Sequence, residues 1–314
     1  MIKNNPNIHF IGGGAWGQAL AKTLANSNFD ISILISDKLR IRKLEKSINV
    51  NAYIEPKKLE SAEIVFITTQ SFRVEKSIDQ TISLNPNAKI ILTSKGFANE
   101  KGETFPHIIK KKYPKITFGI LTGPTFASEI SKNLPSAGVI ASENLEFSKF
   151  ISQIFYNTCL RLYPSNDIIG ASVAGAIKNI MAIGSGISDG LKLGENAKSA
   201  LITRGISELS QIITSVGGKK ETAFGLAGMG DMILTCSSEK SRNMRYGKEL
   251  IQKKNIGSKK LVEGLYALKG AKSLSLKYKL DTPIINAIDD FINNGLRIND
   301  IILKLLRRPI KMEF

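Results

Sequence analysis

Lys178 is a candidate catalytic residue because of the residues that surround it in the sequence. It stands with Asn179 inside Ser172–Asp189, a stretch of mostly small and apolar residues whose length suits a helix. Lysine is almost never fully buried without a partner, because its charge is costly to desolvate. We interpret the stretch as a core helix that points one amine at a reaction centre. The alternative is a lysine that snorkels at the rim of an ordinary core helix.

Asp231 is a candidate partner for that amine. It closes the stretch Gly225–Asp231, in which three glycines precede one acid, and glycines permit close backbone approach to a ligand. The carboxylate could orient Lys178 through a salt bridge. Alternatively, Asp231 only caps the helix that is expected to follow it.

Ser241, Arg242 and Asn243 form a polar triplet that suits an anionic ligand. Arginine offers a planar fork of donors that matches a phosphate, and serine and asparagine add further donors. The alternative is the start of a surface helix. Glu263 stands beside an apolar helical pattern, where it could contact a cofactor amide or ribose, or simply occupy a first helical turn.

A glycine-rich turn near the N-terminus suits a dinucleotide. Gly12, Gly14 and Gly17 give the spacing GxGxxG between a short apolar strand, Ile8–Ile11, and an apolar helical pattern. In this motif the first glycine permits the tight turn, the second lets the backbone approach a pyrophosphate, and the third lets the helix pack on the strand. The helix N-terminus then offers free N–H groups to the phosphates.

Asp37 follows the next predicted strand, Ile31–Ile35, at the spacing of the acid that binds the adenosine ribose. Such a carboxylate accepts hydrogen bonds from the ribose hydroxyls and repels a 2′-phosphate. It could instead cap the segment that starts at Lys38. Lys38 and Arg40 could attract a phosphate. We expect NAD or NADP as the cofactor, with NAD preferred because of Asp37.

The elements that must position these residues alternate along the N-terminal half. Helical stretches lie between most of the buried-strand candidates, which favours an α/β fold with a doubly wound, mostly parallel sheet of the Rossmann type. Besides the two strands above, the candidates are Ile64–Thr68, Lys89–Thr93, Phe118–Leu121, Ala137–Ala141 and Leu160–Tyr163.

Two loops at predicted strand ends carry further candidates. Ligands of open α/β sheets bind beyond the carboxyl ends of the strands. Lys95 follows one strand and is placed to touch an anionic or carbonyl substrate, although a solvated loop lysine is the default. Gly123 and Pro124 indicate a turn after another strand, and Thr125 is expected to be the N-cap of a helix that contains Glu129.

The strand pattern fades after Pro164, and we place a domain boundary near Asn166. Residues 1–166 would form the dinucleotide-binding domain and residues 167–314 an all-helical domain for substrate binding and catalysis. The predicted helices of that domain are Ile168–Ile187, Asn196–Ser215, Val262–Lys279, Thr282–Asn293 and one near Asn299–Leu306.

Composition limits the partners. The 314 residues carry a net charge of +17, but the excess is mostly scattered lysine, so we expect no nucleic-acid binding. Cys159 and Cys236 stand far apart, which suits a reducing cytoplasm. Two histidines exclude a histidine-rich metal site, and we expect no metal. No signal pattern is present and no apolar run approaches about 20 residues, so we expect no stable membrane insertion. The oligomeric state stays open, with a homodimer as one option.

Together the motifs resemble the bacterial NAD(P)-dependent glycerol-3-phosphate dehydrogenases. The resemblance spans residues 12 to 267, and its most specific parts surround Lys178 and join Asp231 to the triplet. The matching segments are GGGAWGQALA, the loop at Lys95, TGPTFASEI, AGAIKNIMAIGSGISDGLKLGENAKSALITRG, GLAGMGDMILTCSSEKSRN and VEGLYA.

The resemblance implies a role for each matching position. Lys178 would be the general acid/base, with Lys95 and Asp231 as the other catalytic residues. Positions that contact the substrate or its phosphate would be Lys95, Gly123, Thr125, Lys178, Asp231, Ser241, Arg242 and Asn243. Positions that line the cofactor, besides Gly12, Gly14, Gly17 and Asp37, would be Ala15, Trp16, Lys95, Ala127, Arg242, Leu261 and Glu263.

The implied reaction interconverts dihydroxyacetone phosphate and sn-glycerol 3-phosphate, a small phosphorylated substrate whose product would feed phospholipid synthesis. Burial and Lys95 should lower the pKa of Lys178, while Asp231 should raise it. The family often has arginine or histidine where this chain has Asp37, which favours NAD here. Two other classes remain as alternatives: a related dehydrogenase acting on a 3-hydroxy acid or a sugar acid, and a catalytically silent dinucleotide sensor or anion-binding protein.

Overall fold

The computed structural model describes residues 5–252, 262–310 and 312. Within these ranges the N-terminal half forms one eight-stranded sheet in the order β3-β2-β1-β4-β5-β6-β7-β8. Neighbouring strands are parallel except for β6 and β7. The strands are β1 (Ile8–Ile11), β2 (Ile31–Leu34), β3 (Asn51–Tyr53), β4 (Ile64–Ile67), β5 (Lys89–Leu92), β6 (Phe118–Thr122), β7 (Ser136–Ala141) and β8 (Leu160–Ser165).

Alternation along the buried strands fills both faces of the sheet. Ile8 and Phe10 join an apolar cluster with α1, α2 and α6, whereas Ile11 joins a cluster with α3 and α4. Successive side chains of a strand point to opposite faces, so a continuous apolar run covers both. The helices of this half are α1 (Ala15–Ala25), α2 (Ile41–Ile48), α3 (Val74–Leu84), α4 (Phe105–Lys112), α5 (Ala127–Ile130) and α6 (Leu145–Ile154).

The predicted mostly parallel, doubly wound sheet is confirmed, and each of the seven predicted strands is present within two residues of its expected ends. Strand β3 is not among the strands predicted from the sequence. That strand has three residues, and the first, Asn51, is polar and exposed, so it shows no apolar run. Its backbone pairing with β2 places it at the sheet edge.

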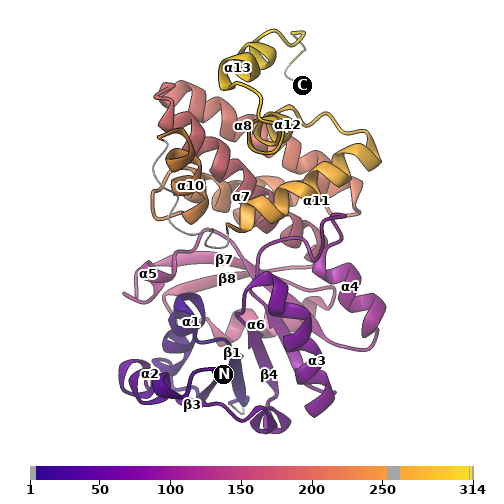
Figure 1. Ribbon diagram of the computed structural model, residues 1–314. Helices are drawn as coiled ribbons and strands as arrows, with labels where there is room; N and C mark the ends of the chain where they lie inside the picture. The colour runs from indigo at the N-terminus through magenta and orange to yellow at the C-terminus, as the bar shows by residue number, and fades with distance from the viewer. Residues whose placement is uncertain (1–4, 253–261, 311, 313–314) are drawn as a thin grey trace.

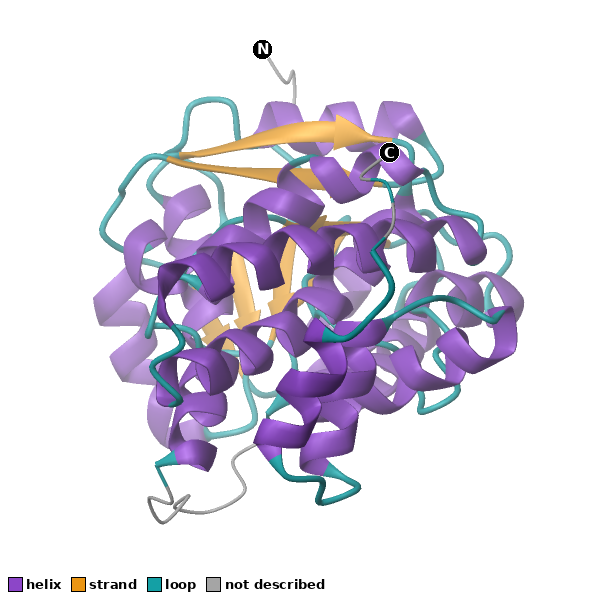
Figure 2. Cartoon of the chain, turned by 90° about the horizontal axis from the view of Figure 1, so that it is seen from above, coloured by secondary structure: helices purple, strands orange, loops and turns teal. Residues whose placement is uncertain are grey.

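The C-terminal half is helical and lies above the sheet in Figure 1. Its centre is α7, and its apolar cluster draws on most of the helices around it. Seen from above in Figure 2, helices stand in front of the strands. The helices are α7 (Ile168–Gly190), α8 (Gly194–Ser215), α9 (Asp231–Cys236), α10 (Arg242–Ile251), α11 (Glu263–Tyr278), α12 (Pro283–Ile292) and α13 (Ile298–Leu306).

Glycines explain how α10 packs so closely on α7. A Cβ on Gly186 would lie 1.9 Å from the Met244 carbonyl oxygen, and one on Gly247 would lie 2.1 Å from the Ile183 carbonyl oxygen. Only glycine allows the two backbones to approach this closely. The small residues noted around Lys178 therefore serve the packing of α7.

The statement that no apolar run approaches membrane-spanning length is wrong for α7. This helix has 23 residues and is apolar enough to cross a bilayer, yet 94% of its most apolar window is buried inside the protein. Burial of this kind is what a core helix shows. The change from strand to helix falls between Ser165 and Ile168. The division into domains 1–166 and 167–314 stays a prediction.

Candidate active site

Lys178 lies near the middle of α7, and its side chain is buried where the two halves meet. The residue is 6% exposed. Its Nζ donates to Asp231 Oδ1 at 2.5 Å and to Thr235 Oγ1 at 3.0 Å. Both partners come from α9. Lys178 is therefore a buried, paired amine and not a snorkelling one.

Asp231 is the first residue of α9 and is 1% exposed. Its second oxygen, Oδ2, accepts from Lys95 Nζ at 2.7 Å. The glycine-rich segment before it packs tightly, because a Cβ on Gly228 would lie 2.3 Å from the Ala223 carbonyl oxygen. The predicted salt bridge to Lys178 is confirmed. One carboxylate thus serves two ammonium groups, and the cluster keeps one net positive charge.

Lys95 reaches this cluster from the loop after β5. Its Nζ also lies 3.4 Å from the Gly123 carbonyl oxygen. Its stem crosses α7 at Gly175, where a Cβ would stand 3.2 Å from that of Lys95. Lys95 and Gly123 follow neighbouring strands, β5 and β6, and meet beyond their carboxyl ends. That Lys95 touches the substrate stays a prediction.

The electrostatics of the cluster follow from burial and pairing. Burial lowers the pKa of Lys178 to about 8, the Asp231 carboxylate opposes this shift, and the Lys95 ammonium adds to it. These are the directions expected from the sequence. Burial works to raise the pKa of Asp231, but the two ammonium groups outweigh it and the pKa is lowered. Asp231 is therefore a carboxylate at neutral pH.

The polar triplet begins α10. Ser241 caps this helix, its Oγ accepting from the Met244 N–H at 3.3 Å. Asn243 is buried, donates to Asn179 Oδ1 at 2.9 Å and accepts from the Gly264 N–H at 3.1 Å. Arg242 is exposed. The triplet is thus a helix start, as the alternative held, and it also borders the cluster through Asn179, the neighbour of Lys178 in the chain.

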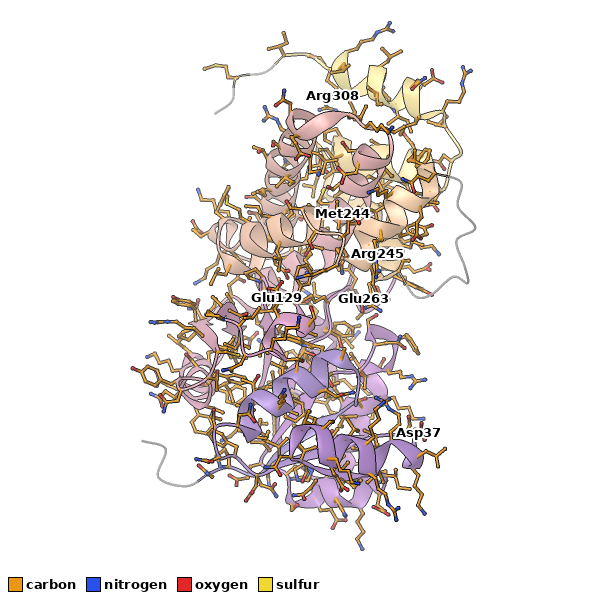
Figure 3. The ribbon with its side chains drawn as sticks, turned by 90° about the vertical axis from the view of Figure 1, so that its left-hand side faces the viewer. Asp37, Glu129, Met244, Arg245, Glu263 and Arg308 are labelled. Atoms are coloured by element: carbon orange, nitrogen blue, oxygen red, sulfur yellow. The ribbon has the colours of Figure 1, made fainter. Side chains whose placement is uncertain are left out.

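Glu263 begins α11 and lies in the field of three cations. Burial raises the pKa of Glu263, while Arg242, Lys95 and Lys178 each work to lower it. Figure 3 shows Glu263 and Glu129 where the halves meet, with Asp37 well apart in the N-terminal half. Leu261, predicted to line the cofactor, lies outside the described residues.

The loop between β6 and α5 corrects one expectation. The N-cap of α5 is Phe126, without a side-chain cap, so the prediction that Thr125 caps this helix is wrong. The Thr125 hydroxyl donates instead to the Gly123 carbonyl oxygen at 3.2 Å. The helix begins at Ala127, one residue later than expected, so Thr125 lies just before the N-cap position.

The glycine-rich turn has the geometry that a pyrophosphate requires. Gly12 has φ +112°, a left-handed conformation that favours glycine. A Cβ on Gly17 would lie 2.3 Å from the Gly12 carbonyl oxygen, whereas one on Gly14 would have no atom of the described residues within 4 Å. The first turn of α1 contains no acidic residue, and its N-cap, Gly14, has no side chain with which to cap the helix. Ala15 and Trp16 start this helix, and Trp16 and Ala127 pack partly buried against one apolar cluster.

Asp37 is exposed and follows β2, so it lies beyond the carboxyl ends of the parallel strands β1 and β2, as the glycine turn does. Its Oδ1 accepts from the Leu39 N–H at 3.0 Å, so it caps the short 3₁₀ helix Lys38–Arg40 as the alternative held. The Arg40 guanidinium donates to the Gly13 carbonyl oxygen at 2.7 Å. A carboxylate and a guanidinium therefore both stand beside the turn.

Known proteins match this chain along nearly all of its length. The family model for the N-terminus of NAD-dependent glycerol-3-phosphate dehydrogenase matches residues 7–148, and the model for its C-terminus matches residues 167–303. This chain belongs to that family. Its two halves are the two halves of such a dehydrogenase.

Similar family members come from several bacteria. A glycerol-3-phosphate dehydrogenase [NAD(P)+] of Nitrosomonas europaea is 35% identical and aligns with 96% of this chain and 98% of its own. One from Francisella tularensis is 32% identical over 98% of this chain and 99% of its own. The crystal structure of glycerol-3-phosphate dehydrogenase from Coxiella burnetii superposes with a TM-score of 0.86, at 31% identity, and covers 97% of this chain and 99% of that one.

Two side chains at the cluster, those of Thr235 and Asn179, are not predicted from the sequence. Thr235 binds Lys178, and its hydroxyl also bonds to the Asp231 carbonyl oxygen at 2.6 Å. Asn179 joins α7 to Asn243. A four-residue step from Asp231 to Thr235 on a predicted helix could have indicated the first contact. The sequence places Asn179 beside Lys178 but does not indicate its partner.

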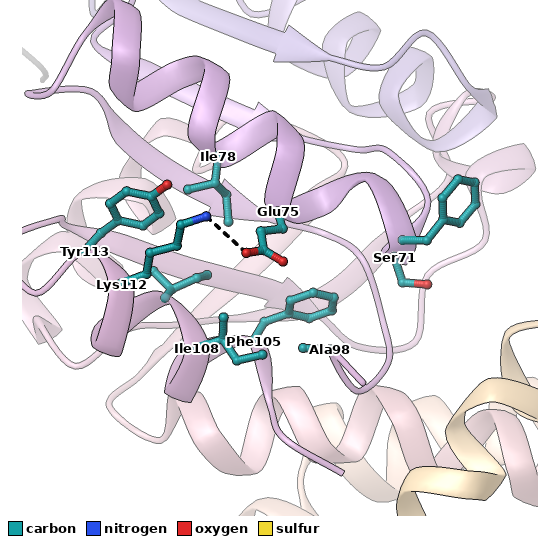
Figure 4. A pocket seen from close by; sticks show the side chains of 10 residues that line it. Ser71, Glu75, Ile78, Ala98, Phe105, Ile108, Lys112 and Tyr113 are labelled. Atoms are coloured by element: carbon teal, nitrogen blue, oxygen red, sulfur yellow. Dashed lines mark hydrogen bonds and ion pairs between the residues drawn. The ribbon is translucent and has the colours of Figure 1, made fainter. Parts of the chain in front are cut away.

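A hollow elsewhere on this dehydrogenase lies between α3 and α4 (Figure 4). Apolar side chains such as Ile78 and Phe105 line it, and at one end Lys112 Nζ pairs with Glu75 Oε1 at 3.1 Å. Its lining includes none of the residues predicted to bind substrate or cofactor. Among the described residues, no three side chains of His, Cys, Asp or Glu gather into a metal-binding group.

Proposed function

We propose that this protein interconverts dihydroxyacetone phosphate and sn-glycerol 3-phosphate with NAD(P)H. The observation that carries the proposal is the buried cluster of Lys178, Asp231 and Lys95, which keeps one positive charge between the two halves. Reduction of a ketone develops negative charge on its oxygen, and a preorganised cationic group stabilises that charge. The family membership supplies the reaction class.

The dinucleotide fits the glycine-rich turn. The open space beside Gly14 and the uncapped first turn of α1 suit a pyrophosphate, which the helix N-terminus attracts. When bound, the nicotinamide supplies or accepts a hydride. Gly12, Gly14, Ala15, Trp16 and Gly17 would hold the cofactor, together with Asp37, Lys95, Ala127, Arg242, Leu261 and Glu263.

Lys178 acts as the general acid in reduction and as the general base in oxidation. Its lowered pKa brings the amine closer to neutral pH, where one group can both give and take a proton. Asp231 orients the amine through Oδ1 and holds Lys95 through Oδ2. Both ammonium groups then face the same substrate oxygen, with Gly123 and Thr125 at the edge of the site.

Arg242 binds the substrate phosphate. Its side chain is exposed and acts on Glu263 together with Lys95 and Lys178, and its guanidinium fork matches a phosphate in two hydrogen bonds. Ser241 and Asn243 assist. Ser241 accepts one N–H and can still donate its own proton, and among the described residues the Asn243 amide donates only to Asn179 Oδ1, so its second hydrogen could bind the phosphate.

The deciding experiment follows NADH and NADPH oxidation with dihydroxyacetone phosphate and with dihydroxyacetone. Activity with the phosphorylated ketone alone supports the proposal. Equal activity with the unphosphorylated ketone, or with 3-hydroxy acids in the reverse direction, would favour the related dehydrogenase. Cofactor binding without turnover of any substrate would favour the silent sensor.

Arg242→Lys should raise KM for dihydroxyacetone phosphate while kcat changes much less. The charge stays, but the bidentate fork is lost, and a lysine ammonium binds a phosphate as a point charge. Steady-state kinetics on the variant measure both constants. Arg245→Lys, an exposed change one helical turn along α10, is the matched control and should leave KM unchanged. An unchanged KM in Arg242→Lys would remove Arg242 from the phosphate site.

Cofactor preference belongs to the same proposal: we expect activity with both cofactors and a preference for NADH. One oxygen of Asp37 caps the 3₁₀ helix, and the other, which has no partner within the described part of the chain, could accept from a ribose hydroxyl. A 2′-phosphate there would meet like charge, although Arg40 stands close by.

Asp37→Arg should therefore move the preference toward NADPH. The measurement is kcat/KM for NADH and NADPH at one salt concentration, on the wild type and the variant, with Asp30→Arg as a control at the opposite end of β2. A wild type that favours NADPH tenfold or more would show that Lys38 and Arg40, and not Asp37, govern this pocket.

The setting of the enzyme is part of the proposal. Cys159 and Cys236 are both free thiols, which suits a cytoplasmic location. Glycerol 3-phosphate made there would supply phospholipid synthesis. A homodimer stays a prediction, to be read from the sedimentation velocity of the purified protein.

A further inference from the structure

The loop that carries Lys95 is seated on the helical half by one aromatic side chain. Phe97 is 8% exposed and belongs to the apolar cluster around α7, although it comes from the N-terminal half. Its ring lies against α11 at Gly270, where a Cβ would stand 2.6 Å from Phe97 Cδ2. The contact therefore depends on a large apolar side chain at position 97 and on the lack of any side chain at position 270.

Further contacts hold the same loop on the same face of α11. Glu100 Oε1 accepts from Lys269 Nζ at 2.6 Å, and the Glu100 carbonyl oxygen accepts from Ser273 Oγ at 2.8 Å. Gly102, with φ +80°, passes so close that a Cβ on it would lie 2.7 Å from the Gly270 carbonyl oxygen. The ion pair is exposed and worth little by itself. Burial of Phe97 is the larger contribution.

Only Gly96 separates Phe97 from Lys95 in the chain. The stem of Lys95 packs at Gly175 of α7, and its Nζ reaches Asp231. A loop lysine has several rotatable bonds, so its amine keeps one position only if the backbone beneath it is fixed. Here the fixed point next to that backbone is Phe97.

We propose that Phe97 is a positioning residue for the reaction, and that its burial against Gly270 holds the Lys95 ammonium on Asp231 and beside the substrate. The inference rests on the proposed function, because it assigns Lys95 to substrate binding. Phe97 itself reaches the site only through Lys95.

Loss of the contact between Phe97 and α11 should change the pKa of Lys178. The charged and titratable groups around Lys178 are Asp231 and Cys236 of α9, Lys95 of the loop and Glu263 of α11. Of these, Lys95 lowers the pKa of Lys178 and Asp231 raises it. If Lys95 leaves, its repulsion ends and Asp231 serves Lys178 alone. Both changes raise the pKa of Lys178.

The experiment compares Phe97→Ala and Phe97→Leu with the wild type and with Phe147→Ala. Phe147 is 5% exposed in the N-terminal cluster, so its truncation is the matched control for lost core packing. For each protein, kcat/KM for dihydroxyacetone phosphate is measured against pH, and trypsin cleavage after the exposed Lys101 is followed in the folded state.

Phe97→Ala should raise KM for dihydroxyacetone phosphate about threefold or more, and should move the alkaline limb of the pH profile upward by about half a unit or more. It should also speed cleavage after Lys101. Phe97→Leu, which keeps an apolar group of similar reach, should restore both the limb and KM. Phe147→Ala should lose stability and keep the wild-type profile.

Phe97→Ala with the KM, pH profile and cleavage rate of Phe147→Ala would overturn the inference. A failure of the proposed function is separable from this result. If the wild type reduces no dihydroxyacetone phosphate, the function fails, and cleavage after Lys101 then decides alone whether Phe97 seats the loop. A cleavage rate in Phe97→Ala equal to that in Phe147→Ala would show that Phe97 does not hold the loop on α11.

Discussion

Replacing Lys178 with alanine should lower kcat for reduction of dihydroxyacetone phosphate by about 10²–10⁴-fold, the usual contribution of a general acid. The amine is buried and held at 2.5 Å from Asp231 Oδ1, in a position that a lysine on the protein surface cannot reach. NADH binding should change little, because the glycine-rich turn lies in the other half. Steady-state kinetics and fluorescence titration with NADH measure the two properties.

Lys198→Ala is the matched control for this variant. Lys198 is also a mostly buried lysine of the helical half, paired with Asp189 at 2.8 Å, but it lies outside the cluster. It should keep most of the wild-type kcat. If Lys178→Ala keeps more than about a tenth of kcat, a loss below about 1.4 kcal/mol, Lys178 is not the acid.

The pH profile of the wild type gives the same assignment a second test. Ketone reduction needs the ammonium form of Lys178, and burial lowers the pKa of that group to about 8. The value of kcat/KM for reduction should therefore fall as the pH rises through about 8, and that for oxidation should rise over the same range. Methylamine added to Lys178→Ala would restore part of the rate if a missing amine is the cause.

Residue types and local spacing were enough to predict much of this molecule. The spacing GxGxxG between Ile8–Ile11 and an apolar helix predicted a tight glycine turn. Such a prediction succeeds because the φ angles, the close backbone contacts and the helix capping of a turn depend on residues that are neighbours in the chain. Gly12, with φ +112°, bears this out. Lys178 inside an apolar stretch predicted a buried partner, because an unpaired charge there is too costly.

Contacts between segments distant in the chain could not be predicted in this way. Asn243 and Asn179 are 64 residues apart, and their hydrogen bond exists because glycines let α10 cross α7 closely. Neither residue alone indicates the other. The same holds for Phe97, which in the sequence looks like any aromatic residue of a loop. Its role depends on its contact with Gly270 of α11, which is distant in the chain. The prediction for Thr125 was wrong for a local reason: α5 begins one residue later than expected, with Phe126 at the N-cap position.

Asp231→Ala should have the second large effect, on stability as well as on rate. Asp231 is the shared counter-ion of Lys178 and Lys95, whose side chains are 8% and 17% exposed. Removing one partner of a buried ion pair leaves uncompensated charge and typically costs about 3–5 kcal/mol. Urea unfolding of the wild type and the variant measures this difference as a change in the free energy of unfolding.

Two further variants separate charge from shape. Asp231→Asn keeps the volume and one acceptor but not the charge, so it should recover part of the packing while the pKa of Lys178 falls further, because the carboxylate that raises it is gone. Asp189→Ala breaks the ion pair between Asp189 of α7 and Lys198 of α8, and it should cost less, because Lys198 keeps Glu195 as a second partner at 3.4 Å. If Asp231→Ala unfolds as easily as Asp189→Ala and no more, the two lysines find other partners or water, and the cluster does not depend on Asp231. A clear difference between them would mean that the charge which prepares Lys178 for proton transfer also holds the two halves together.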